Sequence, residues 1–267
     1  MSSVLDQENI DNLCVDVSEA SGTSREQQKW SEDVILFQPY QVEQITLPDY
    51  AQCLAVEAFL RMTGIIFRVE QRTNAAEMSP SGKVPFIQVG SQLIAEFEPI
   101  VKFAASKGYC LCKDKPEQAV AEMWAYVSML DNILTNAELY VAWMVPDVLA
   151  EVTKPRYGCA YPWPLNWILP WLKQREVQHL MTIKDWASKS LGEVTGEVRV
   201  CLRALSEKLD KNKFFLGPTP SELDAVVFGH IFILQTSKLP GSPFNKLVSQ
   251  FDNLGNFCKR IESTYFF

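Results

Sequence analysis

The chain has 267 residues, of which 47% are hydrophobic and 21% charged. This length suits one large domain or two small ones, and the composition excludes both a disordered chain and a typical integral membrane protein. The formal net charge of −7 argues against nucleic acid as a partner, because binding phosphates requires a surplus of Lys and Arg on one face.

The first 32 residues form a polar, acidic segment that we predict to be a disordered lead-in. Its early charges are all acidic and its first base is Arg25, an order that fits neither a secretory signal nor a mitochondrial presequence. Further along, no apolar stretch reaches the roughly 20 residues that a membrane-spanning helix needs. We therefore expect any membrane attachment to be peripheral.

Residues 33–110 alternate between strand and helix signals. Short apolar runs predict strands, and Gly90-Ser91 between two of them is a hairpin signal. The first two strands flank a helix that Asp49 can cap, so these strands should be parallel. The expected order is a strand at 34–37, a helix at 49–62, strands at 65–70, 84–89 and 92–95, and a helix at 98–107. This order predicts an α+β thioredoxin-like domain.

Residues 116–267 predict an all-helical domain, because apolar side chains recur there at helical spacing. The helices are expected at 117–144, 166–190, 193–211, 221–238 and 244–264. The earlier helix at 49–62 is apolar nearly all round between 53 and 60, so it needs cover on more than one side. The chain's own helical half, through the apolar pattern over 120–141, is the expected cover, and a place in a dimer surface is the alternative.

The seven cysteines are scattered without a CxxC pair, which is typical of a reducing compartment. Cys110 and Cys112 are close in sequence, but the two histidines, His179 and His230, lie far from them. Because structural zinc needs four converging ligands, we predict no metal site, and no cofactor-binding residue stands out. We predict that His230 is a packed, hydrogen-bonded, neutral imidazole rather than a general base.

Three features, in chain order, resemble the glutathione-transferase architecture. Val84-Pro85 opens the third strand, where that superfamily has a cis-proline whose backbone faces the glutathione cysteine. The segment 90–100 is similar to the family's Gly-x-x-Leu-x-Glu-Ser stretch. Ser221 and Asp224 resemble its helix-starting Ser-x-x-Asp box. Their spacing allows a reciprocal helix cap, so we expect a structural role for both. The resemblance implies a glutathione-transferase C-terminal-like domain after the thioredoxin-like one.

The departures from that pattern concern catalysis. Phe97 lies where the family places the Ser that binds the γ-glutamyl carboxylate, and a phenyl ring cannot hydrogen-bond a carboxylate. Leu54 lies where many members have Arg. Tyr50 could still supply a hydroxyl near the first helix. The sequence therefore predicts a protein without enzyme activity, and a divergent glutathione-dependent transferase stays open as the alternative.

Several unusual stretches follow one another along the chain. They read Met-Ser-Pro-Ser-Gly-Lys-Val-Pro-Phe-Ile at 78–87, Tyr-Pro-Trp-Pro-Leu-Asn at 161–166 and Leu-Asp-Ala-Val-Val-Phe-Gly-His at 223–230. With shorter blocks in the same order, they resemble the metaxin family over nearly the whole predicted folded chain.

That resemblance implies a non-enzymatic subunit that lies peripherally on the cytosolic face of the mitochondrial outer membrane. It would pair with a second metaxin, which holds it on the membrane, and with an outer-membrane β-barrel assembly protein. Together they would act in a sorting and assembly complex for protein import and β-barrel insertion. Some metaxins are linked to motor adaptors that move mitochondria, so mitochondrial transport is a secondary expectation.

The segment around Tyr161, Trp163 and Trp167 is rich in aromatic residues and proline. It could be an ordered crossover between helices, stiffened by proline and filled by Trp, or a contact surface of the kind in which Trp and Tyr dominate. We take these three residues as the candidate partner surface, with both interpretations open. Arg156 and the bases at 173–175 are expected to be solvated or to face acidic lipids or an acidic client.

Overall fold

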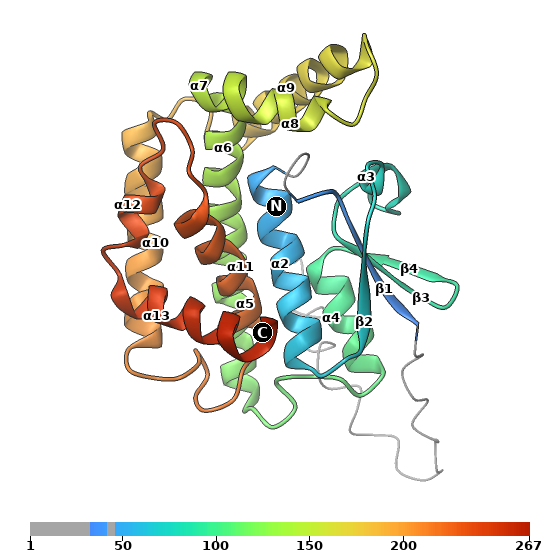
Figure 1. The fold of residues 1–267 in the computed structure, drawn as a ribbon. Helices are drawn as coiled ribbons and strands as arrows, with labels where there is room; N and C mark the ends of the chain where they lie inside the picture. Colours follow the sequence, from blue (N-terminus) through green and yellow to red (C-terminus); the bar gives the residue numbers. More distant parts are fainter. Residues whose placement is uncertain (1–32, 42–45) are drawn as a thin grey trace, which may run out of the picture.

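The computed structural model describes residues 33–41 and 46–267, which form a four-stranded sheet with helices and then an all-helical half (Figure 1). The predicted lead-in over 1–32 lies outside the described residues. The sheet order is β2-β1-β3-β4. β1 pairs with β2 in parallel and with β3 antiparallel, and β3 pairs with β4 antiparallel, so the predicted unit of parallel strands and the hairpin are confirmed. The strands are β1 (Val34–Gln38), β2 (Phe67–Gln71), β3 (Phe86–Val89) and β4 (Gln92–Ala95).

β1 lies inside the sheet and is buried on both faces, as its unbroken apolar run predicts. Because successive side chains of a strand point to opposite faces, Val34 and Leu36 join the large core shared with the helical half, whereas Ile35 and Phe37 join a smaller core. In the smaller core the Phe37 ring stacks on Phe86 with centroids 4.8 Å apart. A hydrophobic core therefore packs against each face of the sheet.

Three helices accompany the sheet. α2 (Leu47–Met62) and α4 (Phe97–Ser106) lie close to their predicted positions. The short α3 (Ala75–Met78) occurs in a polar stretch for which no element is predicted. It contributes Ala75 to the smaller core, and a helix of a single turn is too short to leave a readable apolar period.

The helical half differs from prediction at helix ends and in the short helices within 146–158, which are not predicted. The helix predicted over 166–190 ends at Ile183, just before Asp185 with its left-handed backbone, and Ser190 and Glu193 form a capping box that starts the next helix. The last predicted helix, 244–264, is divided in two near Phe251. The elements are α5 (Glu117–Leu130), α6 (Asn136–Met144), α7 (Pro146–Val148), α8 (Lys154–Gly158), α9 (Leu165–Ile183), α10 (Leu191–Leu209), α11 (Glu222–Thr236), α12 (Phe244–Val248) and α13 (Asp252–Ile261). π-helical turns at Asp131–Thr135 and Leu149–Thr153 join α5 to α6 and α7 to α8.

α2 is covered by the chain's own helical half, as predicted, but mainly by another helix than the one predicted. The main helical neighbour of α2 is α11, with α6 contributing less, rather than the whole pattern over 120–141 (Figure 1). At the crossing, a Cβ added to Gly229 would lie 2.3 Å from the carbonyl oxygen of Ala51 and 3.2 Å from the Cβ of Ala55. Small residues on both helices allow this approach, and periodicity within one helix does not reveal which helix will meet it. Among the described residues, no helix combines the length and apolar character needed to cross a bilayer.

Candidate functional site

The proline that opens β3 has the expected geometry. The Val84–Pro85 peptide bond is cis, so this prediction is confirmed. The carbonyl oxygen of Pro85 accepts a hydrogen bond from the backbone N–H of Glu96 at 3.2 Å, and Glu96 adopts a left-handed backbone conformation with φ of 71°. Pro85 is thus tied to the start of α4, where a glutathione-binding Ser would be needed.

Phe97 occupies that position and is buried. Its ring packs edge-on against Phe59 of α2, with centroids 5.9 Å apart, and Leu54 is buried on the same helix. The ring fills this part of the core and offers no hydrogen bond to a carboxylate. The position expected to bind the γ-glutamyl group is therefore an apolar packing position.

A cavity of about 400 Å³ lies between the two halves at the start of α2. Its lining includes Thr46, Leu47 and Tyr50 from α2 and its cap, Thr153 and Arg156 from the helical half, and Lys238 after α11. Burial, and then the charges of Glu57 and Cys53, raise the pKa of Tyr50 above its ordinary value. A phenol with a raised pKa is a weaker acid, whereas stabilising a thiolate favours a more acidic donor. Tyr50 lines this cavity, whereas Phe97 does not.

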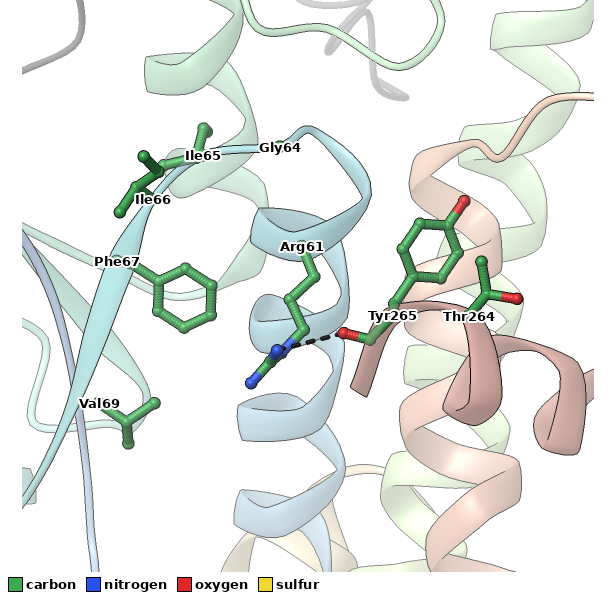
Figure 2. Close-up of a pocket in the computed structure, with 8 residues that line it drawn as sticks. All are labelled: Arg61, Gly64, Ile65, Ile66, Phe67, Val69, Thr264 and Tyr265. Atoms are coloured by element: carbon green, nitrogen blue, oxygen red, sulfur yellow. Dashed lines mark hydrogen bonds between the residues drawn. The ribbon is translucent and has the colours of Figure 1, made fainter. Parts of the chain in front are cut away.

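A second, more open hollow of about 510 Å³ lies between the edge strand β2 and the C-terminal residues Thr264 and Tyr265 (Figure 2). Among the residues that line this hollow, Arg61 carries the positive charge. The guanidinium donates to Glu57 at 2.8 Å and to the carbonyl oxygen of Tyr265 at 3.1 Å, and it lies over the Phe266 ring at 4.7 Å. Arg61 therefore ties the C-terminal segment to α2.

Ser221 and Asp224 form the predicted cap at the start of α11. The carboxylate of Asp224 accepts from the backbone N–H of Ser221 at 2.8 Å and from that of Phe215 at 3.0 Å, and the Ser221 hydroxyl also donates to it. Burial raises the pKa of Asp224 to about 6, against the lowering effect of these hydrogen bonds. Both carboxylate oxygens accept hydrogen bonds inside the protein, which supports the structural role.

A buried carboxylate beside this cap is missed by the sequence reasoning. Glu222 accepts from the backbone N–H of Leu111 at 3.1 Å and from the Cys112 thiol at 2.6 Å. Glu222 thereby fastens the connection between the two halves to α11. Burial and the charge of Glu222 raise the pKa of the Cys112 thiol far above its ordinary value, so it stays a thiol. Within 33–41 and 46–267, no group of acidic, Cys and His side chains could hold a metal ion.

His230 is packed and hydrogen-bonded, as predicted. Its Nδ1 lies 2.8 Å from Oε1 of Glu138, and both side chains are fully buried between α11 and α6. Burial acts to lower the pKa of His230, but the charge and hydrogen bond of Glu138 outweigh it and the pKa is raised. Burial also raises the pKa of Glu138. The pKa values of both partners are thus raised, and the pair is held together by the bond between Nδ1 and Oε1.

The raised pKa values of His230 and Glu138 make the stability of the protein depend on pH. Because both folded pKa values lie above the ordinary ones, the folded state binds more protons and the free energy of unfolding falls as pH rises. The contribution of His230 is complete below about pH 6.5 and is lost as pH rises through its folded pKa. We expect the urea midpoints of the wild type and His230→Gln to differ more near pH 6 than near pH 8. An equal gap at both pH values would contradict this assignment.

The three residues of the candidate partner surface separate in the structure. Trp163 and Trp167 are exposed, whereas Tyr161 is half-buried and donates its hydroxyl proton to Glu77 of α3. The Trp163–Pro164 bond is also cis, which the sequence does not predict. Tyr161 therefore serves the ordered crossover, and the tryptophans supply the exposed surface.

Comparison with known proteins agrees with this architecture. The family models for the "Glutathione S-transferase N-terminal domain" and the "Glutathione S-transferase, C-terminal domain" match residues 51–148 and 198–261. The glutathione S-transferase of Ceriporiopsis subvermispora in complex with glutathione has a TM-score of 0.58 at 13% identity, covering 86% of this chain and 96% of that chain. A glutathione transferase of Phanerochaete chrysosporium has a TM-score of 0.58 at 16% identity, covering 87% and 97%. At these identities the likeness shows the fold, and the predicted fold class is confirmed.

Much higher identity links the chain to metaxins. Metaxin-2 of Homo sapiens is 44% identical over 237 residues, which are 89% of this chain and 90% of that protein. The Metaxin-2 homolog of Caenorhabditis elegans is 42% identical over 209 residues, or 78% and 90% of the two chains. Metaxin-1 of Mus musculus is 30% identical over 220 residues, or 80% and 69%. The chain, with its glutathione-transferase-like fold and its Phe97 in place of the glutathione-binding Ser, therefore belongs to the metaxin family.

Proposed function

We propose that this protein is a non-enzymatic subunit of a mitochondrial outer-membrane protein sorting and assembly complex. It lies peripherally on the cytosolic face and acts in protein import and β-barrel insertion. Its partners are a second metaxin, with which it forms a heterodimer, and an outer-membrane β-barrel assembly protein. A link to mitochondrial motor adaptors is a secondary role. Membership of the metaxin family supports this proposal.

The single observation that carries the non-enzymatic part is the buried Phe97. Its ring packs on Phe59 where a glutathione carboxylate would need a hydroxyl. Placing a carboxylate there would bury an unpaired charge against an aromatic ring. The cavity beside Tyr50 is the feature that favours the alternative, a divergent glutathione-dependent transferase.

A test of glutathione binding distinguishes the non-enzymatic subunit from the glutathione-dependent transferase. We expect the full-length chain to pass through glutathione resin and to show no thiol transfer to an electrophilic test substrate. The Phe97→Ser variant is the matched control, because it restores the hydroxyl at this position. Retention of the wild type that free glutathione reverses, together with thiol transfer, would establish the transferase instead.

Partner capture tests the assembly role. The tagged full-length chain, purified from gently solubilised mitochondria, should bring down a second metaxin and an outer-membrane β-barrel assembly protein. Alkaline carbonate should release the chain from the membrane. If neither partner is recovered, or the chain stays in the carbonate pellet when the second metaxin is deleted, the proposed attachment is wrong.

A further inference from the structure

The molecule carries a concentrated exposed apolar surface at the start of α9. We call it the aromatic ridge and define it as Trp163, Leu165, Trp167, Trp171 and Leu172, whose exposed fractions are 84%, 43%, 74%, 44% and 50%. α8 and α9 lie at one end of the molecule, and their connection projects beyond the body at the top of Figure 1. An exposed cluster of large apolar side chains of this kind indicates an interaction site.

Two of the tryptophans are neighbours on the surface of α9. Trp167 and Trp171 are four residues apart, the spacing of neighbours on a helix, and Trp163 lies two residues before the helix begins. Arg175 continues the row, and its guanidinium lies 4.9 Å from the centroid of the Trp171 ring. Within the described part of the chain, the indole N–H groups of the two most exposed members, Trp163 and Trp167, have no hydrogen-bond partner.

The ridge is held rigidly on the protein. A Cβ added to Gly158 of α8 would lie 2.4 Å from the carbonyl oxygen of Asn166, so the backbones of α8 and α9 are in direct contact. The Tyr161 hydroxyl bonds Glu77 and fastens the connection to α3. The exposed rings therefore project from a fixed support and lose little conformational freedom on binding.

Several basic side chains come from the same segment as the ridge. Lys154, Arg156, Lys173 and Arg175 lie between residues 152 and 175, a segment without Asp or Glu. Arg156 lines the cavity at the start of α2, and Lys173 pairs with Glu176 just beyond the segment at 2.8 Å. Exposed Trp and Leu side chains bordered by bases match an anionic lipid surface. There the apolar bodies enter the acyl boundary, the indole N–H groups meet lipid oxygens and the bases meet headgroups.

We propose that the aromatic ridge is a bilayer contact surface that inserts at the headgroup level of an anionic membrane. This goes beyond the proposed function, in which a partner recruits the chain, because the ridge would orient the recruited protein on the lipid. A protein partner is the other occupant expected for this segment, but the projecting ridge, the unpartnered indole N–H groups and the base Arg175 beside Trp171 favour lipid.

Vesicle binding by the purified full-length chain, with no partner present, tests the proposal. The probes are vesicles of phosphatidylcholine alone and of phosphatidylcholine with one fifth phosphatidylserine. We expect co-sedimentation with the anionic vesicles and quenching of Trp fluorescence by lipids brominated near the headgroup. Trp163→Ala/Trp167→Ala should weaken binding by about tenfold or more. Lys173→Gln/Arg175→Gln should remove most of the preference for anionic vesicles.

The matched control is Ile66→Ala/Val200→Ala, which removes two apolar side chains that are 84% and 63% exposed outside the ridge. This control should bind anionic vesicles like the wild type. Absence of wild-type binding, or equal loss in the control, would overturn the proposal. If the ridge variant keeps its vesicle binding but loses the second metaxin in the partner capture, the ridge is a protein surface. The quenching measurement needs no variant, so a folding defect cannot decide the result.

Discussion

Replacing Glu138 with alanine is expected to lower the free energy of unfolding by about 3 to 5 kcal/mol, because it leaves His230 buried without its partner. The two side chains are completely buried, and their 2.8 Å contact joins α6 to α11. Oε2 of Glu138 and Nε2 of His230 have no partner in the described part of the chain, so the remaining bond carries the whole pair. Urea denaturation at neutral pH measures the loss.

Glu138→Gln is the matched control for this prediction. The amide oxygen of Gln can still accept a hydrogen bond from Nδ1 of His230 in nearly the same space, and the imidazole can become neutral. We expect this variant to lose less than half as much stability as Glu138→Ala. Equal losses would mean that the charge of Glu138 matters and its hydrogen bond does not. A loss of under about 1 kcal/mol for the alanine variant would contradict the pairing.

Replacing Gly229 with alanine should also destabilise the protein, by about 3 kcal/mol, because the new methyl group has no room. It would lie 2.3 Å from the carbonyl oxygen of Ala51 and 3.0 Å from the backbone nitrogen of Ala55. Both contacts are with the backbone of α2, so relief requires the two helices to move apart. Thermal and urea denaturation of the purified variant measure the effect.

Gly196→Ala is the control for the intrinsic effect of replacing glycine with alanine in a helix. Gly196 lies in α10, and nothing lies within 4 Å of a Cβ added there. Alanine is favoured over glycine in helices by about 1 kcal/mol, so this variant should be slightly more stable than the wild type. If Gly229→Ala behaved like Gly196→Ala, the close crossing of α2 and α11 would be wrong.

The sequence predicts those features that depend on local pattern. The strand at Val34–Gln38 follows from its unbroken apolar run, and the cap at Ser221 follows from an acid three residues later. The cis bond before Pro85 follows from a resemblance in the flanking stretch, since most X-Pro bonds are trans.

Other features depend on contacts between distant parts of the chain. Glu138 and His230 are 92 residues apart, and the identity of neither residue predicts which residue it will contact. The choice of α11 to cover α2 rests on Gly229 meeting Ala51 and Ala55, which no single helical pattern contains. The exposure of Trp163 and the engagement of Tyr161 with Glu77 also require the fold, because composition alone cannot distinguish an exposed Trp from a buried one.

The position of α11 along the chain affects when the protein can fold during its synthesis. α2 ends at Met62, whereas the helix that covers it spans Glu222–Thr236, so α2 is synthesised well before its cover. Domains usually fold in order as they leave the ribosome, but here a helix of the first half needs a helix of the second half. A nascent chain that stalls before residue 222 would expose the apolar face of α2 to solvent. Such a chain is the form that holding chaperones should bind most strongly.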